Sequence, residues 1–312
     1  MKSFRLILLL AVSLFAQHLL AEDFDNELQR AAVVGDVDEI GRLLALGANP
    51  KSANKYGKSA LMFAVEEGNA EAAQLLLDKG ADVSAKSVAG CTALTFAAEG
   101  GHLGLAELLL SKGAIKETKT RTGWDALMFA GRYGHAEVVS LLISQGANVN
   151  TSDKDGMTVL MAAADKGHYQ VVKILLKAGA DIHVRDRHNA SAFIIAAGHG
   201  RLPILAMLLA AGVNVNEQDE DGATALHWAA EKGNVNTVAV LLDRGAEINH
   251  QDQGGMTPLM VAAVNGQEKV VRVLLEKGAD TGIKDASGAT ALDQSRKTNQ
   301  EGVAEILSKA SK

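Results

Sequence analysis

The sequence predicts an all-α repeat solenoid, and three observations carry this prediction. A leucine recurs every 33 residues without insertion, at Leu61, Leu94, Leu127, Leu160, Leu226, Leu259 and Leu292, with Phe193 in the remaining position. A glycine recurs at the same interval, at Gly68, Gly101, Gly134, Gly167, Gly200, Gly233 and Gly266. A leucine pair follows in most repeats, as in Leu241-Leu242. A fixed period in this range is typical of stacked-repeat proteins.

Residues 223–255 show how one repeat is built. Apolar residues at helical spacing predict a short first helix that ends at Gly233. A second apolar stripe predicts another helix and consists of Val238, Leu241 and Leu242. Gly245 follows where a left-handed cap residue is expected, and a polar turn comes next. Two such short helices cannot bury their apolar faces alone, so stacked neighbours must complete the core.

The segment ATALHWAAEKGNVNTVAVLLDRGA resembles the ankyrin repeat, whose pattern is Thr-Pro-Leu-His, two alanines, Gly-His, a leucine pair and Gly-Ala. The resemblance covers residues 25 to about 308 and implies helix-turn-helix repeats joined by β-hairpin loops. The proline of the pattern survives only at Pro258, and the histidine is kept at His227. In the family this histidine ties down the hairpin by hydrogen bonds. We therefore expect looser turns where methionine replaces it, at Met62, Met128, Met161 and Met260.

Residues 1–21 are expected to be a cleaved secretory signal peptide. A basic start is followed by an apolar run over 6–16, and Ala21 offers a small-residue cleavage site. The alternative is an uncleaved membrane anchor, but spanning a bilayer takes roughly 20 apolar residues. The exported chain would then cover residues 22–312, in the periplasm if the source is bacterial and secreted otherwise.

Charge and cysteine content argue against two classes of protein. The formal net charge is −6 and becomes −8 once Lys2 and Arg5 are removed, whereas general nucleic-acid binders are usually basic. The single cysteine, Cys91, allows no internal disulfide. Stability is therefore expected to come from the stacked apolar core.

The exported chain is predicted to be one elongated, curved domain of nine repeats. Residues 25–57 form an N-terminal cap, 58–288 contain seven internal repeats, and 289–312 form a C-terminal cap in which Asn299 replaces the glycine. Terminal repeats usually carry a polar outer face. In the first helix of the N-terminal cap that face is expected at Asn26, Glu27, Gln29 and Arg30. At about 10 Å per step, the stack would be on the order of 80 Å long.

The histidines do not predict a catalytic or metal centre, and no cofactor is expected. Three of them follow the repeat glycine and would lie too far apart to share a zinc ion, whose ligands lie at roughly 2 Å; we expect local hydrogen bonds from His102, His135 and His168. A metal-dependent enzyme is a minor alternative that rests on His188 and His199. Cys91 has no base in its own repeat that would activate it as a nucleophile.

Binding of another protein is the favoured function, because repeat arrays present extended concave surfaces. The resemblance implies contacts through the hairpin tips and the ends of the first helices. Tryptophan, tyrosine and arginine are enriched in interface hot spots, and these types gather in the repeat 124–156. The predicted protein-binding residues are Arg121, Trp124, Arg132, Tyr133, Lys154, Met157 and Lys166. Trp228 lies inside a first helix, where other repeats have Phe63, Phe96 and Phe129, and is expected to belong to the core.

The hairpin 115–121 departs most from the pattern and forms a basic edge on an acidic chain. It lacks the usual Val-Asn and Asp and carries Lys116, Lys119 and Arg121 beside Trp124. A partner with an acidic surface is therefore expected.

The predicted function is an exported, non-catalytic, monomeric scaffold that binds a partner protein, without nucleic acid and without stable membrane insertion. The alternatives are a secreted effector that acts on a host protein and a toxin-neutralising (immunity) protein. If the source is eukaryotic, Asn150-Thr151-Ser152 and Asn189-Ala190-Ser191 fit glycosylation acceptors.

Overall fold

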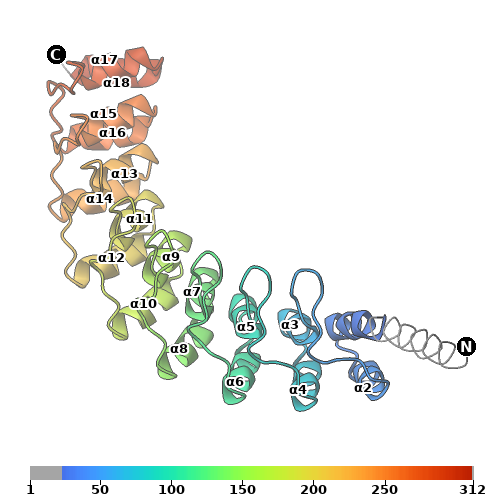
Figure 1. Ribbon diagram of the computed structural model, residues 1–312. Helices are drawn as coiled ribbons and strands as arrows, with labels where there is room; N and C mark the ends of the chain where they lie inside the picture. Colours follow the sequence, from blue (N-terminus) through green and yellow to red (C-terminus); the bar gives the residue numbers. More distant parts are fainter. Residues whose placement is uncertain (1–22, 311–312) are drawn as a thin grey trace, which may run out of the picture. The chain divides into compact units, whose positions relative to one another are not determined.

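The computed structural model describes residues 23–310, so the signal peptide predicted for residues 1–21 lies outside the described part. Its contacts divide the chain into two compact units, residues 1–151 and 152–312, called here the N-terminal half and the C-terminal half. Within each half, short helices follow one another along the chain (Figure 1). None of the helices described is both long and apolar enough to cross a membrane.

Each half consists of helix pairs that repeat along the chain. The N-terminal half begins with a helix over residues 23–34. It continues with α2 (Val37–Ala45), α3 (Ala60–Glu66), α4 (Ala70–Asp78), α5 (Ala93–Gly100), α6 (Leu103–Ser111), α7 (Ala126–Tyr133) and α8 (Ala136–Ser144). The C-terminal half contains α9 (Val159–Lys166), α10 (Tyr169–Lys177), α11 (Ala192–Gly198), α12 (Leu202–Ala210), α13 (Ala225–Glu231), α14 (Val235–Asp243), α15 (Pro258–Val264), α16 (Glu268–Glu276), α17 (Ala291–Lys297) and α18 (Glu301–Ala310).

The predicted all-α repeat solenoid is confirmed. Between residues 23 and 310 the loops carry no strand of a sheet, only isolated antiparallel bridges at Ala53–Ser59, Ser152–Thr158 and Gln218–Thr224. The first helices begin at a Ser, Thr or Asp cap, as at Ser59, whose hydroxyl accepts from the Met62 amide. Gly101 and Gly134 cap α5 and α7 in the left-handed conformation, as the repeated glycine predicts.

The core runs between the two layers of helices and is filled by small and branched side chains. The repeated leucine of the first helices is buried in every internal repeat, as at Leu61, Leu94 and Leu127. The paired alanines are fully buried too, and their size lets neighbouring first helices pack closely. In the N-terminal cap, Asn26, Glu27 and Arg30 are exposed as expected, but Gln29 is buried, so the prediction of a polar outer position there was wrong.

Consecutive repeats are joined by a side chain that follows the repeat glycine. This side chain donates to a carbonyl at the C-terminal end of the first helix in the preceding repeat, a contact called here the inter-repeat bridge. Asn234 Nδ2 lies 2.8 Å from the Gly198 oxygen, and Gln267 Nε2 lies 2.9 Å from the Glu231 oxygen. His102 and His135 make the same bridge, to the oxygens of Glu66 (3.2 Å) and Glu99 (2.7 Å), so the prediction that they bond locally was wrong. These carbonyls have no partner within their own helix.

His227 makes the hydrogen bonds that the family histidine is expected to make. Its Nδ1 accepts from the Thr224 amide at 3.2 Å, and its Nε2 donates to the Met256 carbonyl of the next hairpin at 3.0 Å. Both bonds hold the neutral imidazole. Burial lowers the pKa of His227, since the charged form loses its hydration there.

We predict that Asn234→Ala lowers the free energy of unfolding by about 1–3 kcal/mol, because it leaves the Gly198 carbonyl oxygen without its donor. Asn234 makes no capping bond to its own helix, so the loss reports the bridge. Asn265→Ala is the matched control, since Asn265 is exposed and bonds only to Val261 of its own helix. We expect this control to change stability by less than about 0.5 kcal/mol. Urea unfolding of both variants checks this, and equal losses would contradict the bridge.

With His227→Met, the free energy of unfolding is predicted to fall less steeply as the pH is lowered. The folded pKa is lowered, so below the unfolded pKa of about 6.5 the unfolded chain takes up a proton that the folded chain does not. The contribution of His227 is thus present above pH 6.5 and is lost as the pH falls towards 5. Methionine occupies this position in four other repeats, so the fold accommodates it. Parallel unfolding curves at pH 7 and pH 5 measure the difference, and an identical pH dependence in both proteins would refute the assignment.

Candidate functional site

Four of the predicted binding residues lie in the N-terminal half, around the start and the end of α7. Trp124 precedes the helix, and its backbone is held by the amide of Thr120, which donates to the Trp124 oxygen at 2.8 Å. The Trp124 ring meets the Phe129 ring edge-on with centroids 5.2 Å apart. The Arg132 guanidinium lies 5.2 Å from the centroid of the Trp124 ring. This places an arginine over an aromatic face at the surface, a cation–π arrangement.

Asp125, the N-cap residue of α7, fixes the backbone next to Trp124. Its carboxylate accepts from the Met128 amide at 3.1 Å and from the Thr151 hydroxyl at 2.5 Å. Burial raises the pKa of the Asp125 carboxyl, and the Thr151 hydrogen bond opposes that shift. The neighbouring Trp124 is therefore attached to a fixed backbone.

Tyr133 and Arg121 are the exposed members of the group. The Tyr133 side chain is 47% exposed and its ring stacks on the His135 ring with centroids 6.5 Å apart. Burial raises the pKa of the Tyr133 hydroxyl, and the nearby Glu99 carboxylate adds to the shift. Arg121 lies in the hairpin before α7, where its backbone amide donates to the Ala89 carbonyl of the preceding hairpin at 2.9 Å.

The other three predicted residues belong to the C-terminal half. Lys154 is exposed at a hairpin tip, and Met157 is half-buried with its amide bonded to Asp153 at 2.9 Å. Lys166 is exposed at the end of α9 and pairs with Asp165 at 3.0 Å.

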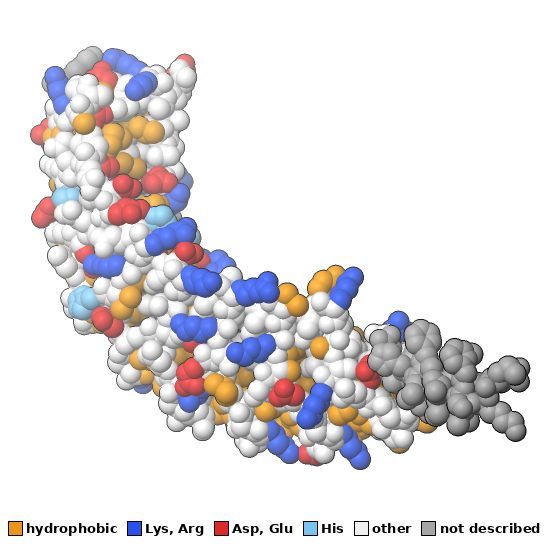
Figure 2. Space-filling model, in the orientation of Figure 1, with side chains coloured by type: hydrophobic (Ala, Val, Ile, Leu, Met, Phe, Trp, Pro, Cys, Tyr) orange, Lys and Arg blue, Asp and Glu red, His pale blue; other side chains and the backbone are white. Residues whose placement is uncertain are grey.

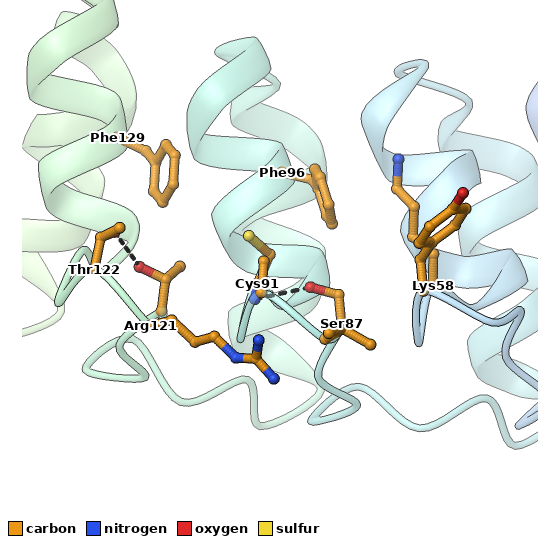
Figure 3. Close-up of a pocket in the computed structure, with 11 residues that line it drawn as sticks. Lys58, Ser87, Cys91, Phe96, Arg121, Thr122 and Phe129 are labelled. Carbon is orange, nitrogen blue, oxygen red and sulfur yellow. Dashed lines mark hydrogen bonds between the residues drawn. The ribbon is translucent and has the colours of Figure 1, made fainter.

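A groove of about 510 Å³ lies beside the predicted group in the N-terminal half (Figure 3). Its lining is mostly apolar and comes from four successive repeats: Tyr56, Lys58, Ser87, Val88, Ala89, Cys91, Phe96, Thr120, Arg121, Thr122 and Phe129. Sites for small ligands usually measure about 300–1,000 Å³. Only Arg121 belongs to both the groove and the predicted set, so most of the groove was missed by sequence reasoning.

The aromatic floor of the groove corrects one expectation. Phe96, Phe129 and Trp228 occupy equivalent positions in their first helices and are half-buried, so the prediction of a core Trp228 was wrong. This position faces the hairpins and not the neighbouring helix pair. A signal was present in the sequence, because its residue type varies from Phe63 to Ala162 and Gln294, while core positions keep leucine or alanine.

Lysine and aromatic rings are combined at one end of the groove. The Lys58 ammonium lies 4.6 Å from the centroid of the Phe63 ring and 4.7 Å from that of Phe96, and it pairs with Glu66. Figure 2 shows Lys and Arg side chains beside hydrophobic ones on the surface of this half. The groove therefore joins exposed apolar surface to positive charge.

The remaining candidates do not form a catalytic constellation. His188 Nδ1 lies 2.6 Å from a Glu220 oxygen, and His199 Nε2 lies 3.3 Å from Asp165. Over residues 23–310 no three His, Cys, Asp or Glu side chains are grouped so that they could hold a metal ion. Cys91 is a half-buried free thiol in the groove lining.

A smaller apolar pocket of about 110 Å³ lies in the C-terminal half, beside Ile195, His199 and Trp228. Trp228 forms part of the lining, and its indole Nε1–H donates to Asp219 at 2.7 Å, which fixes the ring. In the Asn189-Ala190-Ser191 motif, Asn189 is exposed and its side-chain amide donates to the Gln218 carbonyl, whereas Ser191 is fully buried.

Sequence comparison agrees with this architecture. The family model for ankyrin repeats in three copies matches residues 28–120, 112–186, 193–285 and 247–312. No curated protein matches the chain. Since the family model covers most of the sequence, this chain belongs to the ankyrin-repeat family.

Proposed function

We propose that this protein is an exported, non-catalytic scaffold that binds a partner protein through the hairpin and first-helix face of its N-terminal half. Ankyrin repeats generally mediate protein–protein interaction, and the family is typically non-catalytic. The proposal of export rests on the N-terminal residues, which are first basic and then apolar, as in a signal peptide.

The observation that carries the proposal is the Trp124–Arg132 pair beside the groove. Both side chains are held in place by neighbours, so binding would freeze few additional rotamers. Tryptophan and arginine are among the residue types that dominate interface energies, and both of these side chains are half-buried at the surface. Lys154, Met157 and Lys166 belong to the C-terminal half, and their binding role stays a separate prediction.

The positive charge of this half supports an acidic partner. The hairpin segments 51–58, 84–91 and 115–124 carry seven Lys or Arg residues and a single acidic residue, Glu117. Lys116 pairs with Glu117 at 2.8 Å and Lys58 pairs with Glu66, so the hairpins keep an excess of positive charge. Complementary charge steers association and raises its rate.

Affinity capture tests the proposed surface. The chain from Glu22 is incubated with an extract of its own envelope fraction, beside a variant with Trp124, Arg132 and Tyr133 changed to Ala. We expect a partner that the first retains and the variant loses, by at least about tenfold in affinity, because hot-spot truncations cost on the order of 2 kcal/mol or more.

The matched control changes three exposed second-helix residues of the same half, Glu107, Glu137 and Ser140, to Ala. This control should retain the partner. Equal retention by both variants would exclude the Trp124 surface as the binding site.

Cell fractionation tests export. In a bacterial source we expect the protein in the periplasm, with a mass that corresponds to cleavage after Ala21. Recovery in the culture medium would favour a secreted effector instead, and recovery with residues 1–21 attached in the cytoplasm would refute export.

A further inference from the structure

The two hairpins that form the sides of the groove lack a hydrogen bond that other hairpins make. In five hairpins an Asp or Asn oxygen accepts from the backbone amide two residues later, as between Asn54 and Tyr56 at 2.9 Å and between Asp153 and Asp155 at 2.9 Å; the other three pairs are Asp186–His188, Asp219–Asp221 and Asp285–Ser287. This is the Asx turn that such residues form. The equivalent residues at the groove are Ser87 and Thr120.

Those hydroxyls leave two backbone amides unpaired. The Ser87 hydroxyl oxygen accepts from the Cys91 amide, and the Thr120 hydroxyl oxygen accepts from the Trp124 amide, each at 3.1 Å. The Thr120 hydroxyl also bonds to the Thr122 hydroxyl at 2.9 Å, and neither residue's oxygen accepts from the amide two residues later. Among residues 23–310 the amides of Ala89 and Thr122 have no acceptor. Both residues are exposed and line the groove, so their N–H groups can donate to water or to a ligand.

Arg121 adds an unpaired cation at the same place. Its guanidinium makes no ion pair or hydrogen bond with the described residues, and Figure 3 shows it extending towards the hairpin that carries Ser87 and Cys91. No acidic side chain lines the groove. A guanidinium beside two free N–H donors is suited to a carboxylate, which can accept several hydrogen bonds at once.

The apolar part of the groove lies directly beside these donors. Phe96 and Phe129 form its floor, and Tyr56 and Val88 are 62% and 49% exposed at its edge. Large apolar side chains that remain this exposed in a folded chain mark interaction sites when they are grouped.

We propose that the groove binds an extended segment of a partner protein in which an acidic residue adjoins one large apolar side chain. The carboxylate binds Arg121 and the amide of either Ala89 or Thr122, and the apolar side chain enters between Phe96 and Phe129. This inference rests on the proposed scaffold function and names the chemistry of the partner.

A nucleic acid fits the groove less well. Its affinity comes mainly from many phosphate contacts, whereas the groove lining presents only two cations, Lys58 and Arg121. Lys58 is already paired with Glu66. An apolar floor next to a single free guanidinium matches an acidic peptide.

The test selects nonapeptides from a random phage-displayed library on the purified full-length protein. Enriched peptides are expected to contain Asp or Glu within about three positions of Phe, Leu, Tyr or Trp, since these side chains lie next to each other in an extended chain. Enrichment without an acidic residue, or no enrichment at all, would overturn the proposal. A single-stranded oligonucleotide that binds through Arg121 would assign the groove to nucleic acid and overturn it too.

The sharpest variant is Ser87→Asp with Thr120→Asp, which restores the acceptor of the other hairpins. The new carboxylates would satisfy the amides of Ala89 and Thr122 and repel an acidic ligand. We expect an unchanged or higher unfolding temperature and at least a tenfold loss of affinity for an enriched peptide. Unchanged affinity in this folded variant would exclude the amides as ligands.

Charge reversal provides the second arm. Arg121→Glu should weaken the enriched peptide by at least tenfold and should bind better a peptide in which Lys replaces the acidic residue. Arg187→Glu is the matched control, because Arg187 occupies the equivalent hairpin position of the C-terminal half and is already paired with Asp155 at 2.7 Å. A partner retained in the affinity capture but insensitive to both Arg121→Glu and Ser87→Asp/Thr120→Asp would preserve the scaffold function and eliminate the acidic-segment groove.

Discussion

The inter-repeat bridge is the interaction on which the rest of this fold depends. The first helices are only seven or eight residues long, as in α3 and α5, and helices of this length are not stable alone. Each also ends in carbonyls that no residue of its own helix can satisfy. The donor comes from the next repeat, from the residue that precedes its second helix. All the bridging residues seen within either half are donors: Asn69, His102, His135, Arg201, Asn234, Gln267 and Gln300. A donor is favoured there by the negative end of the helix dipole as well. Each repeat is thus completed only by its neighbour, which links the repeats of each half energetically.

The bridge also adds a reason for glycine at the repeated position. The backbone turns through a positive φ there, 72° at Gly233, which disfavours other residues. Space gives a second reason, since a methyl group on Gly233 would lie 2.4 Å from Oε1 of Gln267, and one on Gly101 would lie 2.3 Å from Nδ1 of His135. Asn299 takes the same conformation with φ of 57°, so asparagine can replace glycine at the C-terminal cap.

Periodicity predicts this fold well because the same physical demands recur every 33 residues. Leu226, the alanine pair and Gly233 each serve the interior or the turn, and their repetition reports that role directly. The same reasoning is weaker for the surface. It identified Trp124 and Arg132 by residue type, but it assigned Trp228 to the core and missed the groove above Phe96 and Phe129. Helical spacing shows which side of a helix a residue occupies; it does not show whether a helix or an open hairpin lies opposite. It also could not show that the partner of His135 is a carbonyl 36 residues earlier in the sequence.

The hairpins show where the fold leaves freedom for function. In most repeats an Asp or Asn satisfies the turn amides, and this choice agrees with the local rule for such turns. Ser87 and Thr120 break that rule in two adjacent hairpins, and both breaks face the same groove. The amides of Ala89 and Thr122 lie in exposed residues, so water satisfies them and the fold loses little stability. Departures from a local rule without an internal compensation are expected at functional positions. No acidic residue lines the groove and Arg121 makes no ion pair with the described residues, so the geometry and the charge of the groove point to the same kind of ligand.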